Sequence, residues 1–226
     1  HRIAKQIERF CQAYLSEDMK FEGIEITKPI IKTRAFISRT NSSLVRKLME
    51  LNKLAIPYGT IRDVKDIFAL PLTLISLRPG GFTASSEFKY LQDDANTFGK
   101  SKELQDRYKT LLVYLKDLHE GDSALQQGIS LIFQYGKMEV LDCYEIAKKH
   151  SKKTQDYMLG TVHSCKGLEF DYVELADDLN QAIAPIILSM KLNPDYELST
   201  EERAELNLYY VGCSRSRIEL KNAKYL

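Results

Sequence analysis

The sequence lacks any strong excess of charge of one sign. It has 32 lysine and arginine residues against 31 aspartate and glutamate residues, which gives a formal net charge of +1. A summed charge this small does not by itself indicate a nucleic-acid or membrane partner. Such a partner therefore has to be inferred from local motifs.

Cysteines are few and scattered along the chain. Cys11, Cys143, Cys165 and Cys213 form no C-x-x-C pair and no zinc-ligand spacing. Because structural zinc sites need closely spaced ligands, the sequence predicts no metal site. We expect reduced thiols.

Long hydrophobic runs are also missing. No stretch approaches the roughly 18 to 20 apolar residues that cross a bilayer, and the first residues do not resemble a signal peptide. We therefore expect an intracellular protein, cytoplasmic or associated with the nucleoid or nucleus, with no membrane partner. The composition of 44% hydrophobic and 28% charged residues is typical of globular proteins, and 226 residues are enough for one large domain or for one domain with a compact insertion.

Apolar spacing in the first part of the chain predicts helices around a short strand. The first helix has its apolar positions at Ile3, Ile7, Phe10, Cys11 and Tyr14. The run Ala35-Phe36-Ile37 predicts a strand, and a helix follows with apolar positions at Leu44, Val45, Leu48, Leu51 and Leu54. Asp63 can cap a further helix, which Pro71 is expected to bend or end.

The strongest break in regular structure is predicted at Arg78-Pro79-Gly80-Gly81. Residues 85–153 that follow are polar and helical, with one apolar stripe and several further short helices. The stripe contains Leu104, Tyr108, Leu111, Leu112 and Leu115, and the short helices lie around Ile129, Ile132, Phe133 and Leu141. We therefore predict three segments: residues 1–79 and 156–226 form one domain, and residues 80–155 form a helical insertion.

Strand-like runs return after the insertion. They cover Tyr157 to Val162 and Phe170 to Leu175, and a helix from about Thr200 to Gly212 leads into Ile218-Glu219-Leu220. Strands that alternate with helices on both sides of an insertion predict an α/β fold with a parallel sheet, interrupted by a smaller subdomain.

The most informative segment runs from Gly160 to Val173, with the sequence GTVHSCKGLEFDYV. A polar loop with Thr, His and Lys lies between two strands, where open α/β sheets bind their ligands, and Lys and Thr suit a phosphate. Glu169 stands between Leu168 and Phe170, and a carboxylate buried in that setting would need a cation or hydrogen-bond donors such as sugar hydroxyls. The alternative is a surface turn with one paired glutamate.

Two further segments place an arginine in a polar turn next to regular structure. One is Glu205 to Arg217, a helix that leads into the turn containing Arg215, and the other is Phe36 to Ser42, which places Arg39 after a strand. Arginine binds phosphate oxygens in a bidentate manner, so both are candidate phosphate ligands. An arginine that complements a helix dipole or lies in solvent is the alternative.

In this order, the three segments resemble the second half of the UvrD/Rep/PcrA-type superfamily-one DNA helicases. Phe36–Ser42 is similar to the family's motif IV, and Thr161-x-His163-x-x-Lys166-Gly167-Leu168-Glu169-Phe170 matches motif V at every defining position. Glu205–Arg215 resembles motif VI, although Leu206-Asn207 and Ser214 and Ser216 depart from the most frequent residues. The resemblance implies a RecA-like domain of the P-loop NTPase type, called 2A, with a short helical 2B insertion.

The resemblance also implies an ATP site with Mg²⁺, bound mainly by an N-terminal RecA-like domain of the same protein. Arg39 and Arg215 would approach the γ-phosphate, and Glu169 and Gly167 would lie near the nucleotide, with Glu169 at the ribose. Arginines supplied across a cleft stabilise the transferred phosphoryl group, an effect of about 10³ to 10⁵ in rate.

Single-stranded DNA is the second partner that the resemblance implies. The residues expected to contact the strand, or to couple it to the ATP site, are Thr161, His163, Lys166 and Asn41. The tyrosines Tyr90, Tyr108, Tyr114 and Tyr135 are a further set able to stack on bases, although aromatic residues at helical spacing are more often part of a core. The basic run Lys148, Lys149, His150, Lys152 and Lys153 is either a DNA contact or a solvated cluster.

The parts that hydrolyse ATP are not found in the sequence. A motor needs a Gly-rich phosphate loop and an acidic pair. Gly99-Lys100-Ser101 imitates the end of such a loop, but Asp94 stands where its first glycine would be. We interpret Asp177-Asp178 as a solvated loop. The chain therefore resembles the second half of a longer helicase and is not expected to hydrolyse ATP alone.

Two hypotheses about function follow. In the first, the chain is the C-terminal part of an ATP-dependent DNA helicase that supplies arginines to a shared ATP site. In the second, it is a motorless, degenerate protein with the helicase fold that acts as a nucleic-acid or protein binding module.

Overall fold

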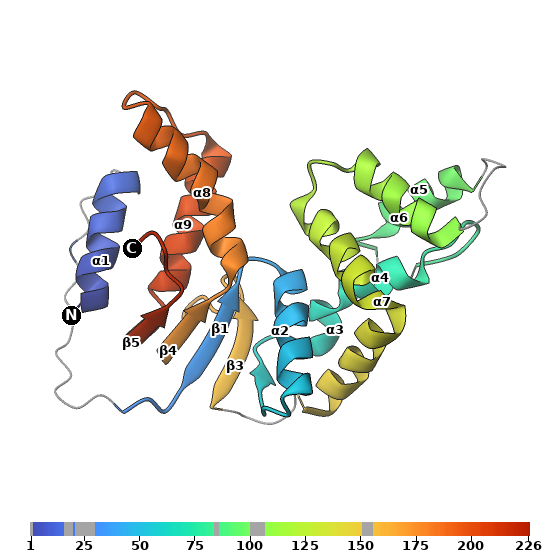
Figure 1. The fold of residues 1–226 in the computed structure, drawn as a ribbon, viewed down its shortest axis with the longest axis horizontal. Helices are drawn as coiled ribbons and strands as arrows, with labels where there is room; N and C mark the ends of the chain where they lie inside the picture. The colour runs from blue at the N-terminus through green and yellow to red at the C-terminus, as the bar shows by residue number, and fades with distance from the viewer. Residues whose placement is uncertain (1, 16–19, 21–29, 84–85, 100–106, 151–155) are drawn as a thin grey trace. The chain divides into compact units, whose positions relative to one another are not determined.

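The computed structural model describes residues 2–15, 20, 30–83, 86–99, 107–150 and 156–226 (Figure 1). These residues form two compact units. The sheet unit consists of His1–Leu44, Pro57–Arg62 and Ser151–Leu226, and the helical unit consists of Val45–Ile56 and Asp63–His150. Each unit is described by itself below.

The sheet unit is built on five parallel strands in the order β2-β3-β1-β4-β5. Their bounds are β1 Arg34–Ser38, β2 Gly59–Thr60, β3 Tyr157–Thr161, β4 Phe170–Leu175 and β5 Ser216–Lys221. The central strand β1 pairs with β3 on one side and with β4 on the other. The chain therefore reverses its direction of winding at β1, which is where open α/β sheets bind ligands.

Helices cover one face of this sheet. Alternate residues of β1 and β4, namely Ala35, Ile37, Val173 and Leu175, point into a core shared with α8 (Asp177–Leu192) and α9 (Thr200–Cys213). The helix α1 (Arg2–Phe10) and the π-helical turn η1 (Cys11–Leu15) that continues it complete this layer beside β5 and α9.

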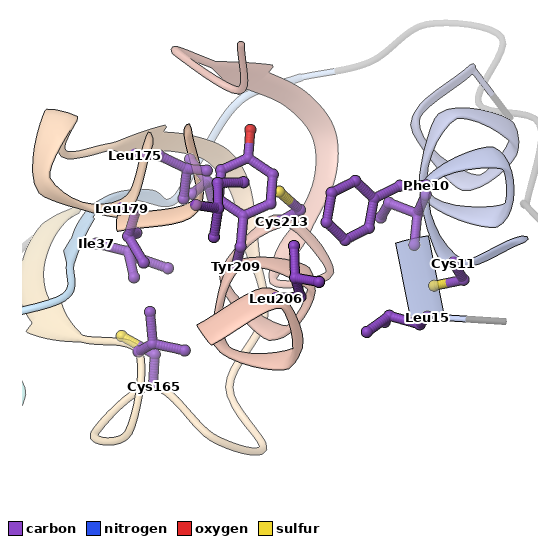
Figure 2. Close-up of a cluster of buried hydrophobic side chains, with 14 of the residues drawn as sticks. Phe10, Cys11, Leu15, Ile37, Cys165, Leu175, Leu179, Leu206, Tyr209 and Cys213 are labelled. Carbon is purple, nitrogen blue, oxygen red and sulfur yellow. The ribbon is translucent and has the colours of Figure 1, made fainter. Parts of the chain in front are cut away.

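The N-terminal helix is fixed to α9 by aromatic and aliphatic packing (Figure 2). The ring of Phe10 lies 5.4 Å from the ring of Tyr209, and Leu15 and Leu206 are both buried in the same cluster. Arg203 donates a hydrogen bond to the carbonyl of Leu15 at 3.3 Å. The amphipathic pattern of the first residues thus predicted a helix correctly, and the contacts show that its apolar side packs on α9.

The helix α8 corrects one prediction. Asp177 and Asp178, interpreted above as a solvated loop, form the first turn of this helix, and Asp178 is only 7% exposed. Acidic residues are favourable in a first helical turn because they face its unpaired backbone N–H groups. The spacing of Leu179, Ile183, Ile186 and Ile187 is the sequence signal that would have predicted α8.

The helical unit contains α3 (Val64–Ile67), α4 (Ala69–Ser76), α5 (Lys89–Phe98), α6 (Arg107–Leu118) and α7 (Ser123–His150), all between β2 and β3 in the chain. It also contains most of α2 (Asn41–Lys53), whose first residues belong to the sheet unit. Asp63 caps α3 as predicted, by accepting a hydrogen bond from the Lys65 N–H. Pro71 lies in the first turn of α4, where its missing N–H costs no helical hydrogen bond.

The core of the helical unit contains the predicted apolar stripe, since Leu111, Leu112 and Leu115 of α6 are buried against residues of α4, α5 and α7. The predicted position Leu104 lies outside the described residues. The expectation of more than one helix around Ile129 and Leu141 agrees with the structure, because Ile129 and Leu141 lie on opposite sides of a break in the helical path. The label α7 covers all 28 residues, but the helical path is interrupted at Gly136, where φ is 80° and ψ is 164°.

The helices α5, α6 and α7 lie within residues 80–155, the range predicted as an insertion. The helical unit that the contacts define also includes α3, α4 and most of α2, which precede the Arg78–Gly81 break. None of the helices in the described ranges is long and apolar enough to cross a membrane.

Candidate phosphate and nucleic-acid site

The loop after β1 is held by a buried carboxylate. Asp178 accepts hydrogen bonds from the backbone N–H groups of Arg39 and Thr40, each at 3.0 Å, and from the Thr40 hydroxyl at 3.0 Å. Because an unsatisfied buried N–H group costs free energy, these bonds fix the backbone of the loop. The backbone of Arg39 is therefore held in a defined position directly after β1.

The side chain of Arg39 is held by a second carboxylate. Its Nε donates to Oε2 of Glu205 at 2.8 Å and its Nη2 donates to Oε1 at 2.6 Å, and both side chains remain about one quarter exposed. The hydrogen bond to Glu205 is the main cause that raises the pKa of Arg39 above its usual value, and the charges of Glu205 and Asp178 add to it. The guanidinium thus already binds an oxyanion in the bidentate manner that a phosphate group also uses.

The loop between β3 and β4 is a series of tight turns. The Cys165 N–H donates to the Thr161 carbonyl at 3.0 Å, the Leu168 N–H donates to the Cys165 carbonyl at 3.0 Å, and the Ser164 hydroxyl donates to the Thr161 carbonyl at 2.9 Å. Burial raises the pKa of the Cys165 thiol to about 12, which favours the protonated thiol over the nucleophilic thiolate. The loop is anchored by buried groups.

Several predicted site residues of this loop face solvent. His163, Lys166, Gly167 and Glu169 are exposed, whereas Thr161 is buried at the end of β3. Of the two readings of Glu169, a buried carboxylate or a residue of a surface turn, the structure has the exposed position, because β4 begins only at Phe170 and Glu169 still belongs to the loop. A ligand can reach all four exposed residues.

Arg215 joins the end of α9 to the same loop. Its Nε donates to the Val211 carbonyl at 3.0 Å, its Nη1 donates to the Leu168 carbonyl at 3.3 Å, and the Phe170 N–H donates to its carbonyl at 2.9 Å. Its Nη2 donates to the Ser214 hydroxyl at 2.8 Å, so the serine that departs from the helicase pattern takes part in holding the arginine.

The predicted residues therefore gather in two places along α9. Arg215 meets the loop of His163 and Lys166 at the C-terminal end of the helix, and Arg39 contacts Glu205 in its first half. Glu205 and Val211 are six residues apart, a rise of about 9 Å. Asn41 begins α2 directly after the Arg39 loop.

Asp178 and Glu205 were not predicted as site residues. Both are separated from Arg39 by more than 130 positions in the sequence. No local pattern pairs residues at such a distance.

Two other candidates from the sequence, the segment Gly99-Lys100-Ser101 and the basic run before β3, lie only partly within the described residues. In the sequence that imitates a phosphate loop, Gly99 is the C-cap of α5, and Lys100 and Ser101 lie outside the described residues. In the basic run, Lys148, Lys149 and His150 form the last turn of α7, and Lys152 and Lys153 lie outside the described residues. Within the described part of the chain, no group of three or more His, Cys, Asp or Glu residues is arranged to hold a metal ion.

A five-stranded parallel sheet with arginine-bearing loops around its central strands defines a RecA-like α/β domain. Residues 83–221 match the family model of the UvrD-like helicase C-terminal domain. The match covers more than half of the chain, and the chain belongs to this family.

Proposed function

We propose that this domain supplies Arg39 and Arg215 to an ATP site that it shares with an N-terminal RecA-like motor domain, and that it couples this site to single-stranded DNA. The observation that carries the proposal is the link between Arg215 and the loop that contains His163 and Lys166, through the hydrogen bond of Arg215 to the Leu168 carbonyl. One side chain thereby contacts the backbone of the loop proposed to touch DNA.

The residues present fit a phosphate group. The carboxylate of Glu205 already occupies the guanidinium of Arg39 with two charge-assisted bonds, in the geometry that phosphate oxygens adopt with arginine. ATP with Mg²⁺, held mainly by the motor domain, would supply the phosphoryl group to be transferred. Arg39 and Arg215 would neutralise the charge that develops on that group, and the exposed Glu169 beside Gly167 would accept hydrogen bonds from the ribose.

The coupling to DNA follows from the β3–β4 loop. His163 and Lys166 are exposed and would contact the strand, whereas Thr161 is buried and would position the loop through Ser164. Asn41, at the start of α2, would add a contact near the Arg39 loop. A shift of Arg215 towards or away from a phosphate would change its bond to Leu168 and so the position of His163 and Lys166.

Alanine variants of the two arginines test the proposal in the complex of this domain with its N-terminal motor domain. We expect Arg39→Ala and Arg215→Ala to lower the DNA-stimulated kcat for ATP hydrolysis by about 10³-fold, as for arginines that stabilise a transferred phosphoryl group. Arg217→Ala is the matched control, because Arg217 is exposed on β5 two residues further on.

The opposite result separates the two hypotheses. ATP hydrolysis within a few-fold of the unmodified protein in both variants would overturn the assignment of the arginines. If the chain alone then bound DNA with an affinity that falls steeply with salt, the motorless binding module would be the better description.

A further inference from the structure

The helical unit contains a groove that is not part of the site described above. Its volume is about 650 Å³, and its lining includes Arg78, Phe82, Tyr108 and Lys137 with the aliphatic side chains of Leu77 and Leu111. This volume is within the range of pockets that bind small organic groups, so it can take a nucleobase and its sugar.

Phe82 is unusual because its side chain is exposed although the turn before it is well anchored. Phe82 is 86% exposed. The Gly80 N–H donates to Oδ1 of Asn96 at 2.8 Å, and Nε2 of Gln92 donates to the Arg78 carbonyl at 2.9 Å. The exposed position of Phe82 forgoes the hydrophobic stabilisation that a buried phenylalanine would contribute to folding.

The same turn also packs closely on the end of α5. A Cβ atom at Gly99 would lie only 2.2 Å from the Cβ of Pro79, so the approach of the turn to α5 depends on a glycine at this position. Phe82 therefore follows a turn with a defined position, and its ring is presented at the groove rather than buried elsewhere.

The charge of the groove is positive. Arg78 and Lys137 are its charged residues, and no acidic residue is found among the described residues that line it. Nζ of Lys137 lies 3.0 Å from the centroid of the Tyr108 ring, and the Tyr108 hydroxyl donates to the Leu74 carbonyl at 3.2 Å. These contacts fix Tyr108 and Lys137 at one side of the groove and leave the ring of Phe82 accessible.

We infer that this groove binds an unpaired stretch of DNA, with one base stacked on Phe82 and neighbouring phosphates contacted by Arg78 and Lys137. Exposed aromatic rings beside basic side chains are the combination that binds single strands, because every base has a face that can stack and every nucleotide carries a phosphate. The inference rests on the part of the proposed function that assigns single-stranded DNA as a partner. It extends the DNA contacts to a second surface.

The test measures binding of the 226-residue chain to a fluorescein-labelled oligothymidylate without ATP, by fluorescence anisotropy. Since stacking contributes about 1–3 kcal/mol per base, we expect Phe82→Ala to weaken binding by about 5- to 150-fold and Phe82→Trp to retain it. Phe133→Ala is the matched control, because Phe133 is an exposed phenylalanine of α7 that does not line the groove. Both sites are exposed, so the variants are expected to fold.

The basic side chains have a separate readout. Removing one cation that neutralises a phosphate of a single strand lowers the slope of log Kd against log salt by about 0.7. We expect this change for Arg78→Gln and for Lys137→Gln, and no change for Lys116→Gln, an exposed lysine of α6 outside the groove.

The outcomes distinguish this inference from the proposed function. The assignment of the groove as a DNA-binding site would be overturned by equal affinities for Phe82→Ala and Phe133→Ala, or by an unchanged salt slope in both basic variants. This holds even if Arg39→Ala abolished ATP hydrolysis. Binding of a polyglutamate peptide as tight as that of the oligonucleotide would also overturn it, because stacking would then contribute nothing. Loss of DNA affinity in Phe82→Ala would support the groove whether or not the arginine variants affect hydrolysis.

Discussion

The guanidinium of Arg39 forms a bidentate pair with the carboxylate of Glu205, at 2.8 and 2.6 Å. This pair links the loop after the central strand to α9, and the two residues are 166 positions apart in the sequence. Together with the bonds from the backbone to Asp178, it fixes both the main chain and the side chain of Arg39. A phosphate that binds Arg39 would have to take the place of Glu205.

The first prediction concerns the strength of this pair. We expect a double-mutant cycle of Arg39→Ala and Glu205→Ala to give a coupling free energy of about 1 kcal/mol, at the upper end for a partly exposed pair because the geometry is bidentate. The measurement is the free energy of unfolding in urea. A cycle with Glu197→Ala, an exposed glutamate that precedes α9, should show no coupling, and equal values in the two cycles would contradict the prediction.

The second prediction compares two neighbouring aspartates at the start of α8. Asp178→Ala leaves two backbone N–H groups of the Arg39 loop without their carboxylate partner, and we expect it to lower the free energy of unfolding by about 2–3 kcal/mol. The side chain of Asp177 is 63% exposed and pairs with Lys224, so we expect Asp177→Ala to lower the free energy of unfolding by at most about 1 kcal/mol. Urea unfolding measures both, and a larger loss for Asp177→Ala would be inconsistent with the contacts.

The third prediction concerns the interruption of α7. Gly136 has φ 80° and ψ 164°, a conformation that is almost restricted to glycine. We expect Gly136→Ala to destabilise the chain by about 1–3 kcal/mol through the backbone alone, because no heavy atom of the described residues around it lies within 4 Å of the added Cβ.

The control for Gly136 is Gly121→Ala, at a position that is equally open and has no positive φ. This substitution should be neutral or slightly stabilising. Thermal unfolding measures both variants, and equal melting temperatures would mean that Gly136 does not need its positive φ.

The fourth prediction concerns acid stability. Hydrogen bonds from the backbone N–H groups of Lys32 and Thr33 lower the pKa of Asp171 below its usual value. A carboxyl group with a lowered pKa in the folded state contributes stability above its unfolded pKa of about 3.9, and this contribution is lost as the pH falls through its folded pKa. We therefore expect Asp171→Asn to lose less stability than the unmodified chain as the pH falls below about 4.

The measurement for Asp171 is the urea midpoint between pH 6 and pH 3. Asp177 and Glu202 also have lowered pKa values, so part of the acid dependence should remain in the variant. Asp195→Asn, at an exposed position after α8, should keep the pH profile of the unmodified chain. If Asp171→Asn had the pH profile of the unmodified chain, the hydrogen bonds from Lys32 and Thr33 to Asp171 would not control the loss of stability at low pH.

Much of the fold could be predicted from local patterns. The strands predicted at Ala35–Ile37, Tyr157–Val162 and Phe170–Leu175 and the helix from Thr200 are confirmed as β1, β3, β4 and α9, because apolar runs in strands and 3.6-residue spacing in helices reflect burial. The capping box of Ser199 and Glu202 is a local signal of the same kind. The helix α8 is absent from the sequence-based prediction because its acidic first turn resembles a loop. The interruption of α7 at Gly136 agrees with the prediction of more than one helix in this region.

The candidate site was less predictable. The sequence identified Arg39, Arg215 and the His163–Glu169 loop as candidates, since motif residues carry their chemistry in their type and spacing. The burial of Thr161 and the exposure of Glu169 depend on where β3 ends and β4 begins. A shift of one residue at a strand end moves a side chain from the core to solvent, and the pattern does not define ends that sharply.

The sequence by itself determined the alternation of strands and helices and the order of the helicase-like motifs, because both are encoded in neighbouring residues. Only the tertiary structure decided that Glu205 and Asp178 hold Arg39, that Arg215 bonds to the Leu168 carbonyl, and that Phe82 is exposed beside Arg78 and Lys137. These contacts join residues from different strands and helices. They exist only because the sheet and the helical core bring distant segments together, which no local spacing specifies.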